Sequence, residues 1–200
     1  MAHLEDLRDK TVGIAGCGGL GSNCAVALAR AGVGHLIIAD FDIISESNLN
    51  RQYYFYDQIG KPKAETLKEN IERINPAIRV TAVNIKLDEL NIKDIFDEVD
   101  VLVEAFDRSD QKQIIIETAL SIWAERPLVI GIGMAGWGGN QLIHMKKYGN
   151  LYICGDRISE IGPGMPPLAP RVGIVANMQA NTVLQILLNG SRVGVQKNIN

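Results

Sequence analysis

The chain has 200 residues, of which 46% are hydrophobic, so residues 1–200 have the size of one domain with a sizeable core. Its net charge of −3 is close to balance, which argues against a general polyanion-binding surface, and we expect no nucleic-acid ligand. The charged N-terminus lacks the apolar core of a signal peptide, and no apolar run is long enough to span a membrane. The three cysteines have no paired spacing, which suits a cytoplasmic location.

A glycine-rich turn between two apolar runs is the strongest signal in the sequence. The run 12–15 predicts a buried strand, the turn 16–21 follows it, and a helix-compatible segment ends at Gly32. A second apolar strand over 36–39 then leads to Asp40. Strand, glycine turn, helix, strand and acid form the dinucleotide-binding fingerprint in its required context. The pattern therefore predicts a nucleotide site, with a bare structural turn as the alternative.

Each glycine of this turn has a geometric role in such a site. Gly16 allows the tight turn, Gly18 lets the backbone approach a phosphate, and Gly21 lets the helix pack closely against its strand. The helix N-terminus offers unpaired N–H groups to an anion, and an acid after the second strand accepts hydrogen bonds from ribose hydroxyls. The nucleotide contacts predicted in this segment are Gly16, Gly18, Gly19, Leu20, Gly21 and Asp40.

The rest of the chain alternates helices with strands. A polar loop runs from residue 43 to 62, and a loop of that length inside a compact domain is usually functional. Helices are predicted over 63–74, 87–96, 112–125 and 173–188, and strands over 80–83, 101–103, 128–130 and 141–145. The segment 161–171 holds four prolines and two glycines and is predicted to be irregular.

This alternation predicts an α/β fold with a Rossmann-like, doubly wound, mostly parallel sheet and additional C-terminal strands. Ligands of such sheets bind beyond the carboxyl ends of the strands, at the point where the strand order reverses. The glycine turn, Asp40 and Asp107 each follow a predicted parallel strand directly. We therefore expect them on the same rim of the sheet.

Four motifs along the chain carry a resemblance to a known family. The glycine turn is followed by Asp40-Phe41-Asp42, by Ser47-Asn48-Leu49-Asn50-Arg51-Gln52 and by Gly60-Lys61-Pro62-Lys63. Together they resemble the ubiquitin-activating-enzyme-like superfamily, in particular its bacterial ThiF/MoeB branch. The segment 47–52 is the most specific of the four, because ordinary dehydrogenases have nothing like it.

The resemblance covers nearly the whole chain. It continues through Asn75-Pro76 and Asp107 into the final helix. Within the branch, the segments 152–156 and 166–171 resemble the short ThiF-type proteins of a second ThiF family.

The resemblance implies an adenylyltransferase that uses ATP and Mg²⁺. Its substrate would be the C-terminal Gly-Gly carboxylate of a small ubiquitin-like sulfur carrier protein, and pyrophosphate would be released. We expect the pathway to be thiamine biosynthesis, with molybdopterin synthesis or ATP-dependent tRNA modification as alternatives. A non-catalytic scaffold and an NAD(P)-binding oxidoreductase are the alternatives from other classes. Against the oxidoreductase, we expect no second catalytic domain in residues 1–200. Against the scaffold, the chain retains Arg51, Lys63 and Asp107 together.

The chemistry explains these residue types without the family name. A carboxylate is ionised at neutral pH, so its attack on a phosphate needs positioning and cations rather than a general base. Arg51 offers a planar fork for phosphate oxygens and Lys63 a compact charge, while Asp107 can hold Mg²⁺. These three are the predicted catalytic residues, and Asp107 is the predicted metal ligand. The remaining predicted nucleotide contacts are Asp42, Asn48 and Gln52.

Each of these side chains has a structural alternative. Arg51 could be a solvated loop arginine, and Lys63 could be an ordinary lysine in the first turn of a helix. Asp107 could be a helix N-cap, although Asp110 suits that position better. Asp42 could be a loop carboxylate without a ligand.

The chain departs from the family pattern in its last third. Many relatives hold zinc with two C-x-x-C pairs, but only Cys154 lies near that position, so we expect no zinc. Cys154 is either a buried structural cysteine or a reactive thiol, and Ser159 lies where relatives carry a sulfur-linking cysteine. Arg8 is the only nearby candidate for the arginine that relatives donate from a partner subunit. The apolar final helix predicts a homodimer, with burial in the chain's own core as the alternative.

Overall fold

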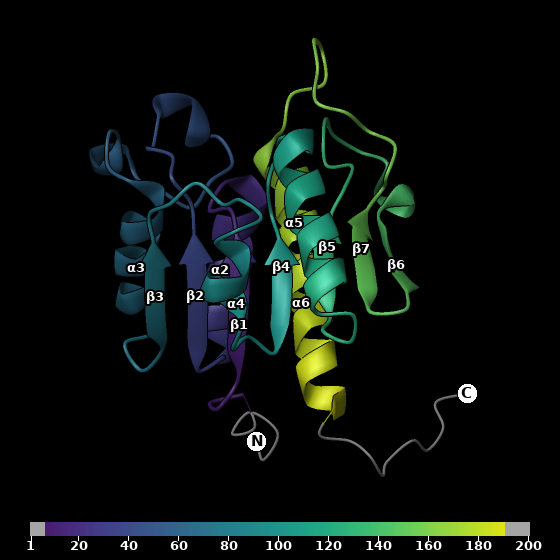
Figure 1. Ribbon diagram of the computed structural model, residues 1–200. Coiled ribbons are helices and arrows are strands. Elements are labelled where there is room, and N and C mark those ends of the chain that lie inside the picture. Colours follow the sequence, from purple (N-terminus) through teal and green to yellow (C-terminus); the bar gives the residue numbers. More distant parts are fainter. Residues whose placement is uncertain (1–6, 191–200) are drawn as a thin grey trace.

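A single seven-stranded sheet organises residues 7–190, the part of the chain that the computed structural model describes. The strand order is β3-β2-β1-β4-β5-β7-β6, and each neighbouring pair is parallel except β6 and β7 (Figure 1). The strands are β1 (Thr11–Ala15), β2 (His35–Ala39), β3 (Arg79–Val83), β4 (Val101–Glu104), β5 (Leu128–Gly131), β6 (His144–Tyr148) and β7 (Leu151–Gly155).

Helices cover both faces of this sheet, so the fold is doubly wound. One face carries α2 (Gly19–Ala31), α3 (Lys63–Ile74) and α6 (Ala169–Gly190). The other carries the short α4 (Ile92–Phe96) and α5 (Ser109–Ile122), which lie in front of the sheet in Figure 1. Among the described residues, no helix is both long and apolar enough to cross a membrane.

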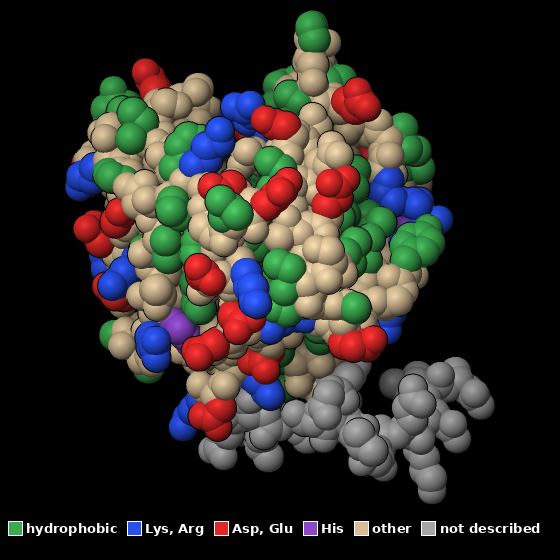
Figure 2. Space-filling model, in the orientation of Figure 1, with side chains coloured by type: hydrophobic (Ala, Val, Ile, Leu, Met, Phe, Trp, Pro, Cys, Tyr) green, Lys and Arg blue, Asp and Glu red, His purple; other side chains and the backbone are tan. Residues whose placement is uncertain are grey.

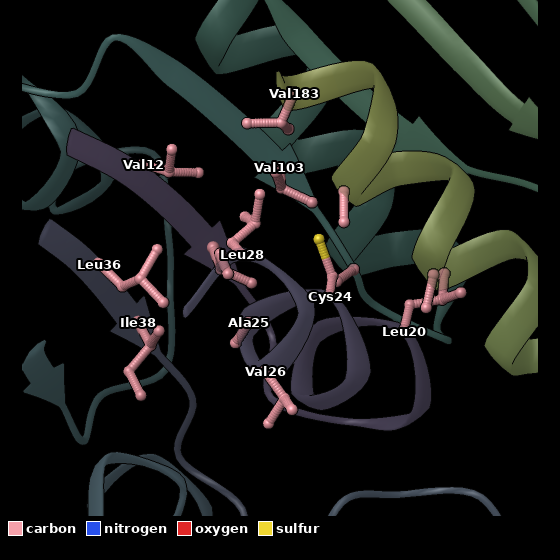
Figure 3. Packing of buried hydrophobic residues seen from close by; sticks show 14 of the residues in the cluster. Val12, Leu20, Cys24, Ala25, Val26, Leu28, Leu36, Ile38, Val103 and Val183 are labelled. Carbon is pink, nitrogen blue, oxygen red and sulfur yellow. The ribbon is translucent and has the colours of Figure 1, made fainter. Parts of the chain in front are cut away.

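Alternation along the strands divides the apolar side chains between two cores. Successive side chains of a strand point to opposite faces, so Val12 of β1 belongs to the core under α2 and α6, whereas Ala15 belongs to the core under α4 and α5. Figure 3 shows Cys24 of α2, Val103 of β4 and Val183 of α6 converging in the first core. The central parallel strands β1, β2, β4 and β5 are buried on both faces, which is why they appear in the sequence as short continuous apolar runs.

Several sequence predictions are confirmed by the structure. The α/β class, the doubly wound parallel sheet and the additional C-terminal strands are all present. Helix α3 has the predicted bounds, 63–74. Helix α2 ends at Gly32, whose φ of 91° is a left-handed conformation that glycine adopts without strain.

The helices α4 and α5 begin elsewhere than predicted, as α6 also does. The helix expected over 87–96 forms only from Ile92 to Phe96, because the Asp88 carboxylate accepts hydrogen bonds from the N–H groups of Leu90 and Asn91. That side-chain turn replaces the first helical turn. The helix expected over 112–125 forms three residues earlier, as α5, and ends at Ile122.

The C-terminal third contains the largest differences from the predictions. The strand expected over 141–145 is a short 3₁₀ turn (Asn140–Leu142) followed by β6, and the strand β7 was not predicted at all. The prediction that 161–171 has no regular structure is wrong for 169–171, which form the first turn of α6. Pro170 fits there because the first-turn N–H groups of a helix have no intrahelical partner.

The apolar residues of α6 are largely used inside the chain. Val175, Val183 and Leu187 are buried against the sheet and α2, while Ile174 remains 41% exposed. Part of the apolar surface from which a homodimer was predicted is therefore core, while Met178, Ile186 and Leu188 are partly buried against it. The homodimer itself stays a prediction.

Candidate functional site

A cleft opens at the carboxyl ends of β2, β1 and β4, where the strand order reverses on the two sides of β1. This is the position at which doubly wound sheets bind ligands. The cleft brings together predicted site residues from five separate segments of the chain. The predicted site residues that line it are Gly16, Gly18, Gly19, Leu20, Asp40, Asp42, Arg51, Lys63 and Asp107.

The glycine turn has the geometry that its sequence predicts. Gly16 has a φ of 97°, in the left-handed region. A Cβ on Gly21 would lie 1.8 Å from the carbonyl oxygen of Gly16, so only glycine lets α2 start this close to β1. Gly21 therefore packs against the backbone of the turn and does not line the cleft.

We expect Gly21→Ala to destabilise the protein by about 2 kcal/mol, because the added methyl group collides with backbone that cannot move aside. A matched control is Gly173→Ala in α6, where an added Cβ has no neighbour within 4 Å. There alanine should be neutral or stabilise by up to about 1 kcal/mol. Denaturant unfolding of both variants checks this difference, and equal effects would contradict the packing role of Gly21.

Asp40 fixes the turn while facing the cleft. Its Oδ2 accepts a hydrogen bond from the N–H of Cys17 at 2.6 Å, and its Oδ1 accepts one from the N–H of Asp42 at 2.8 Å. Burial raises the pKa of Asp40, and Lys63 and the two N–H groups oppose that rise. A carboxylate has about four lone-pair sites, so both oxygens keep acceptor capacity for a ligand hydroxyl.

Lys63 is a buried cation at the edge of the cleft. It opens α3, is only 6% exposed, and its Nζ lies 2.8 Å from Oδ2 of Asp42. Burying an ammonium group is costly unless a charged partner compensates it, and Asp42 supplies that partner. The structure therefore does not support the reading of Lys63 as an ordinary helix lysine, and it gives Asp42 a defined contact.

Arg51 is held in place by its own loop. Its Nη1 donates hydrogen bonds to the carbonyl oxygen of Ser47 at 3.0 Å and to Oδ1 of Asn50 at 2.7 Å. The carbonyl oxygen of Arg51 accepts a hydrogen bond from Asn23 of α2, which ties the loop to the helix behind the glycine turn. The Nε and Nη2 atoms bond to none of residues 7–190. Arg51 is thus not a freely solvated arginine but a half-buried one with donors left for a ligand.

Asn48 and Gln52 lie outside the lining of the cleft. The side-chain oxygen of Asn48 accepts a hydrogen bond from the N–H of Ser45 at 3.0 Å, which closes a turn of the loop. Gln52 is 7% exposed beside Gly18, and its Oε1 has no partner among the described residues. Both residues shape the segment that presents Arg51.

Asp107 lines the cleft with an uncommitted carboxylate. Helix α5 begins at Ser109 with Arg108 in the N-cap position and no side-chain capping bond, so the N-cap alternatives for Asp107 and Asp110 are both wrong. Asp110 lies in the first turn and pairs with Arg108 at 2.8 Å. Asp107 is exposed and makes no hydrogen bond or ion pair with residues 7–190.

The donor chemistry of Asp107 fits a magnesium ion. Mg²⁺ usually takes one or two protein carboxylates and fills its other positions with water and phosphate oxygens. Residues 7–190 contain no group of three or more His, Cys, Asp or Glu side chains that could hold a metal without a ligand's help. A magnesium ion at Asp107 would therefore depend on a bound phosphate.

A buried ion pair fixes the segment that carries Asp107. Glu104, the last residue of β4, is fully buried, and both of its carboxylate oxygens accept hydrogen bonds from Nζ of Lys112 at 2.8 Å. The same ammonium donates to the carbonyl oxygen of Gly131, and the N–H of Phe106 donates to Glu104. Burial raises the pKa of Glu104, and Lys112 opposes that rise. The pair sets the path of the chain from β4 into the cleft.

Sequence reasoning missed four polar or flexible residues of the lining. Lys86 and Met134 each lie three residues beyond a parallel strand, and Arg108 and Gln111 lie around the start of α5. The rule that ligands bind beyond strand ends points to all of these segments. The rule names a rim, however, and it does not say which side chains of a loop turn into the cleft.

The remaining predicted candidates lie away from the cleft. Cys154 is fully buried in β7, its Sγ lies 3.6 Å from Oγ1 of Thr182, and burial raises its pKa to about 11. It is a structural cysteine, because reactive thiols need exposure and a lowered pKa. Ser159 accepts a hydrogen bond from the N–H of Ala135. Arg8 precedes β1, at the amino end of the strands and opposite the cleft.

Comparisons with known proteins agree with this arrangement. The profile of the ThiF family matches residues 1–200. The chain is 32% identical over 190 residues to the molybdopterin-synthase adenylyltransferase of Escherichia coli K12, covering 92% of the chain and 75% of that protein. It is 31% identical over 189 residues to the adenylyltransferase and sulfurtransferase UBA4 of Yarrowia lipolytica, of which it spans 47%.

Solved structures share the fold. The chain resembles the E. coli tRNA N6-threonylcarbamoyladenosine dehydratase TcdA, solved in complex with ATP, with a TM-score of 0.86 and 23% sequence identity. The similarity covers 96% of this chain and 92% of that one. At this identity the likeness concerns the fold alone.

Proposed function

The chain belongs to the ThiF family, and on this premise we propose that it is an adenylyltransferase acting on a small ubiquitin-like sulfur carrier protein. It would transfer AMP from ATP to the C-terminal Gly-Gly carboxylate of the carrier and release pyrophosphate. The names of the curated relatives support the reaction type, since both are adenylyltransferases. Residues 1–200 would act as one adenylating domain.

One observation carries this proposal. A single cleft joins an acid after β2, a glycine turn at a helix N-terminus, two cations and an uncommitted carboxylate. Asp40 suits a ribose, and the turn suits phosphates that Arg51 and Lys63 would neutralise. Asp107 would hold Mg²⁺, which supplies charge neutralisation at the phosphates when it is bound.

The proposed step needs no general base. An oxygen of the carrier carboxylate attacks the α-phosphorus of ATP and forms a C(O)–O–P bond. The bond from the α-phosphorus to the bridging oxygen breaks, and its electron pair leaves with pyrophosphate. The side chains of Arg51 and Lys63 would stabilise that leaving anion, and the backbone N–H groups of the turn would orient the phosphates.

The carrier and its pathway are the finer part of the proposal. Thiamine biosynthesis is the predicted pathway, and the relatives' names make molybdopterin synthesis and tRNA modification its competitors. Basic and acidic side chains are interspersed on the face with α4 and α5, without a continuous basic stripe, which favours a protein substrate over tRNA (Figure 2). Carrier-dependent exchange of labelled pyrophosphate into ATP tests the function. We also propose a cytoplasmic homodimer.

We expect calorimetry to show that ATP with Mg²⁺ binds more tightly than NAD. Both ligands offer an adenosine ribose to Asp40, so the preference must come from the phosphates. Two cations suit the larger charge of a triphosphate. We expect an affinity difference of about tenfold, which corresponds to one added charge-assisted hydrogen bond. Tighter binding of NAD would overturn the adenylation proposal and favour the oxidoreductase alternative.

A further inference from the structure

Gln111 is a buried side chain of the cleft whose amide has no hydrogen-bond partner among the described residues. It lies in the first turn of α5, lines the cleft, and is only 7% exposed. No hydrogen bond joins its side-chain amide to any of residues 7–190. Its amide atoms are not fully enclosed, since they are absent from the buried polar atoms that lack partners. An amide in this state costs free energy unless a ligand satisfies it.

The chemistry of the lining makes Gln111 distinctive. Among the described residues that line the cleft, the other polar side chains are all charged: Asp40, Asp42, Arg51, Lys63, Lys86, Asp107 and Arg108. Charged groups suit phosphates and a metal ion. A carboxamide presents one donor group and one acceptor side by side, and it therefore suits a neutral ligand with the complementary pair.

The topology places Gln111 on a different wall from the glycine turn and the two predicted phosphate-binding cations. The glycine turn opens α2, and Arg51 and Lys63 come from the loop and helix that follow β2 on the same face of the sheet. Gln111 comes from α5, on the opposite face. With the ribose at Asp40 and the phosphates at the turn, the base is the neutral part of the nucleotide left to face the α4 and α5 side.

The surroundings of Gln111 also suit a base. Phe41 follows Asp40 directly, and Phe106 lies within van der Waals reach of the turn, 3.1 Å from a Cβ built on Gly16. Both aromatic rings line the same cleft as Gln111. Apolar walls with one neutral polar side chain at the edge are the usual construction of a specific small-molecule subsite.

We propose that Gln111 reads the adenine base of the nucleotide and excludes guanine. The edge of adenine carries the N6 amino donor beside a ring-nitrogen acceptor, and a glutamine amide pairs with that edge by two hydrogen bonds. Guanine offers two acceptors, O6 and N7, to the same amide. The carbonyl oxygen of Gln111 would then face an acceptor and could not form a hydrogen bond. This inference rests on the nucleotide part of the proposed function and adds a specificity residue to it.

Calorimetric titration with ATP and GTP, each with Mg²⁺, tests the proposal without any carrier. We expect the protein to bind ATP about tenfold or more tightly than GTP. In Gln111→Leu that ratio should fall toward one, mainly because ATP affinity is lost. The matched control is Gln113→Leu, two residues further in the same helix, where the glutamine is exposed and bonds only to Glu117; it should keep the full ratio.

Two results would overturn the proposal: a protein that binds GTP as tightly as ATP, or a folded Gln111→Leu that keeps the discrimination. If Gln111→Leu does not fold, Gln111→Met tests the same point, since it keeps the length of the side chain and removes both the amide donor and the amide acceptor; unchanged discrimination there also overturns the proposal. Failure of the adenylation proposal is separable. A protein that selects ATP through Gln111 but shows no exchange with any carrier would retain the base-reading role and lose the carrier reaction.

Discussion

Asp107→Ala should reduce carrier-dependent pyrophosphate exchange by at least about two orders of magnitude, or about 3 kcal/mol of transition-state stabilisation. The carboxylate lines the cleft and bonds to no described residue, so its charge is free for Mg²⁺ and phosphate. Charge builds on the leaving pyrophosphate as the reaction proceeds, and the loss should therefore appear mainly in turnover. Stability should hardly change, because an exposed rim carboxylate without partners contributes little to the fold.

Asp110→Ala is the matched control for Asp107. Asp110 lies in the same turn of the chain, is exposed, and pairs with Arg108 instead of lining the cleft. Its loss removes a favourable charge from the N-terminus of α5 and should cost stability of about 0.5 kcal/mol. Exchange rate and melting temperature measured on both variants separate the two roles. A fully active Asp107→Ala would remove the metal ligand from the proposed mechanism.

Arg51→Ala should lower exchange by a similar factor and weaken ATP binding as well. The guanidinium meets phosphate already in the ground state, so its removal should raise the dissociation constant for ATP about tenfold or more. The Nη1 contacts to Ser47 and Asn50 fix the side chain in its loop, while Nε and Nη2 are left for phosphate oxygens. Turnover should fall too, because the same charge stabilises the departing pyrophosphate.

Two further variants control for charge and geometry. Arg51→Lys keeps the charge and loses the planar fork, and it should recover only part of the activity. Arg79→Ala removes an exposed arginine at the amino end of β3, on the far edge of the sheet, and should leave both ATP binding and exchange unchanged. Unaltered ATP affinity in Arg51→Ala would show that the arginine serves the loop alone.

The sequence predicts the parallel part of the fold well because its signals are local. Strands buried on both faces appear as short apolar runs. Gly32 ends its helix in a left-handed conformation, and Asn75 ends the next one because a residue before proline disfavours the helical region. The strand β7 is not predicted because its residues Leu151–Gly155 are buried only in part and do not form a continuous buried apolar run. Its position depends on pairing with β5, which a local pattern does not contain.

The candidate site divides in the same way. The rule that ligands bind beyond the carboxyl ends of parallel strands identifies the glycine turn, Asp40 and Asp107. The sequence motifs identify Arg51. The contacts of these residues are tertiary, since Lys63 pairs with Asp42 across 21 positions of sequence. Gln111, which lines the cleft, lies in the first turn of α5, and that turn begins three residues earlier than predicted. Propensity places a helix boundary within a few residues, and one turn decides which side chain faces a ligand.

The most direct test of the account is exchange of labelled pyrophosphate into ATP, measured with a panel of purified sulfur carriers that end in Gly-Gly. Each carrier is paired with a form lacking the last two residues, and a tRNA sample is run beside them. The account predicts exchange that depends on one or more intact carriers and on Mg²⁺, and that disappears with the truncated form. Exchange that is driven by tRNA, or that is absent with every carrier although ATP binds, would contradict it.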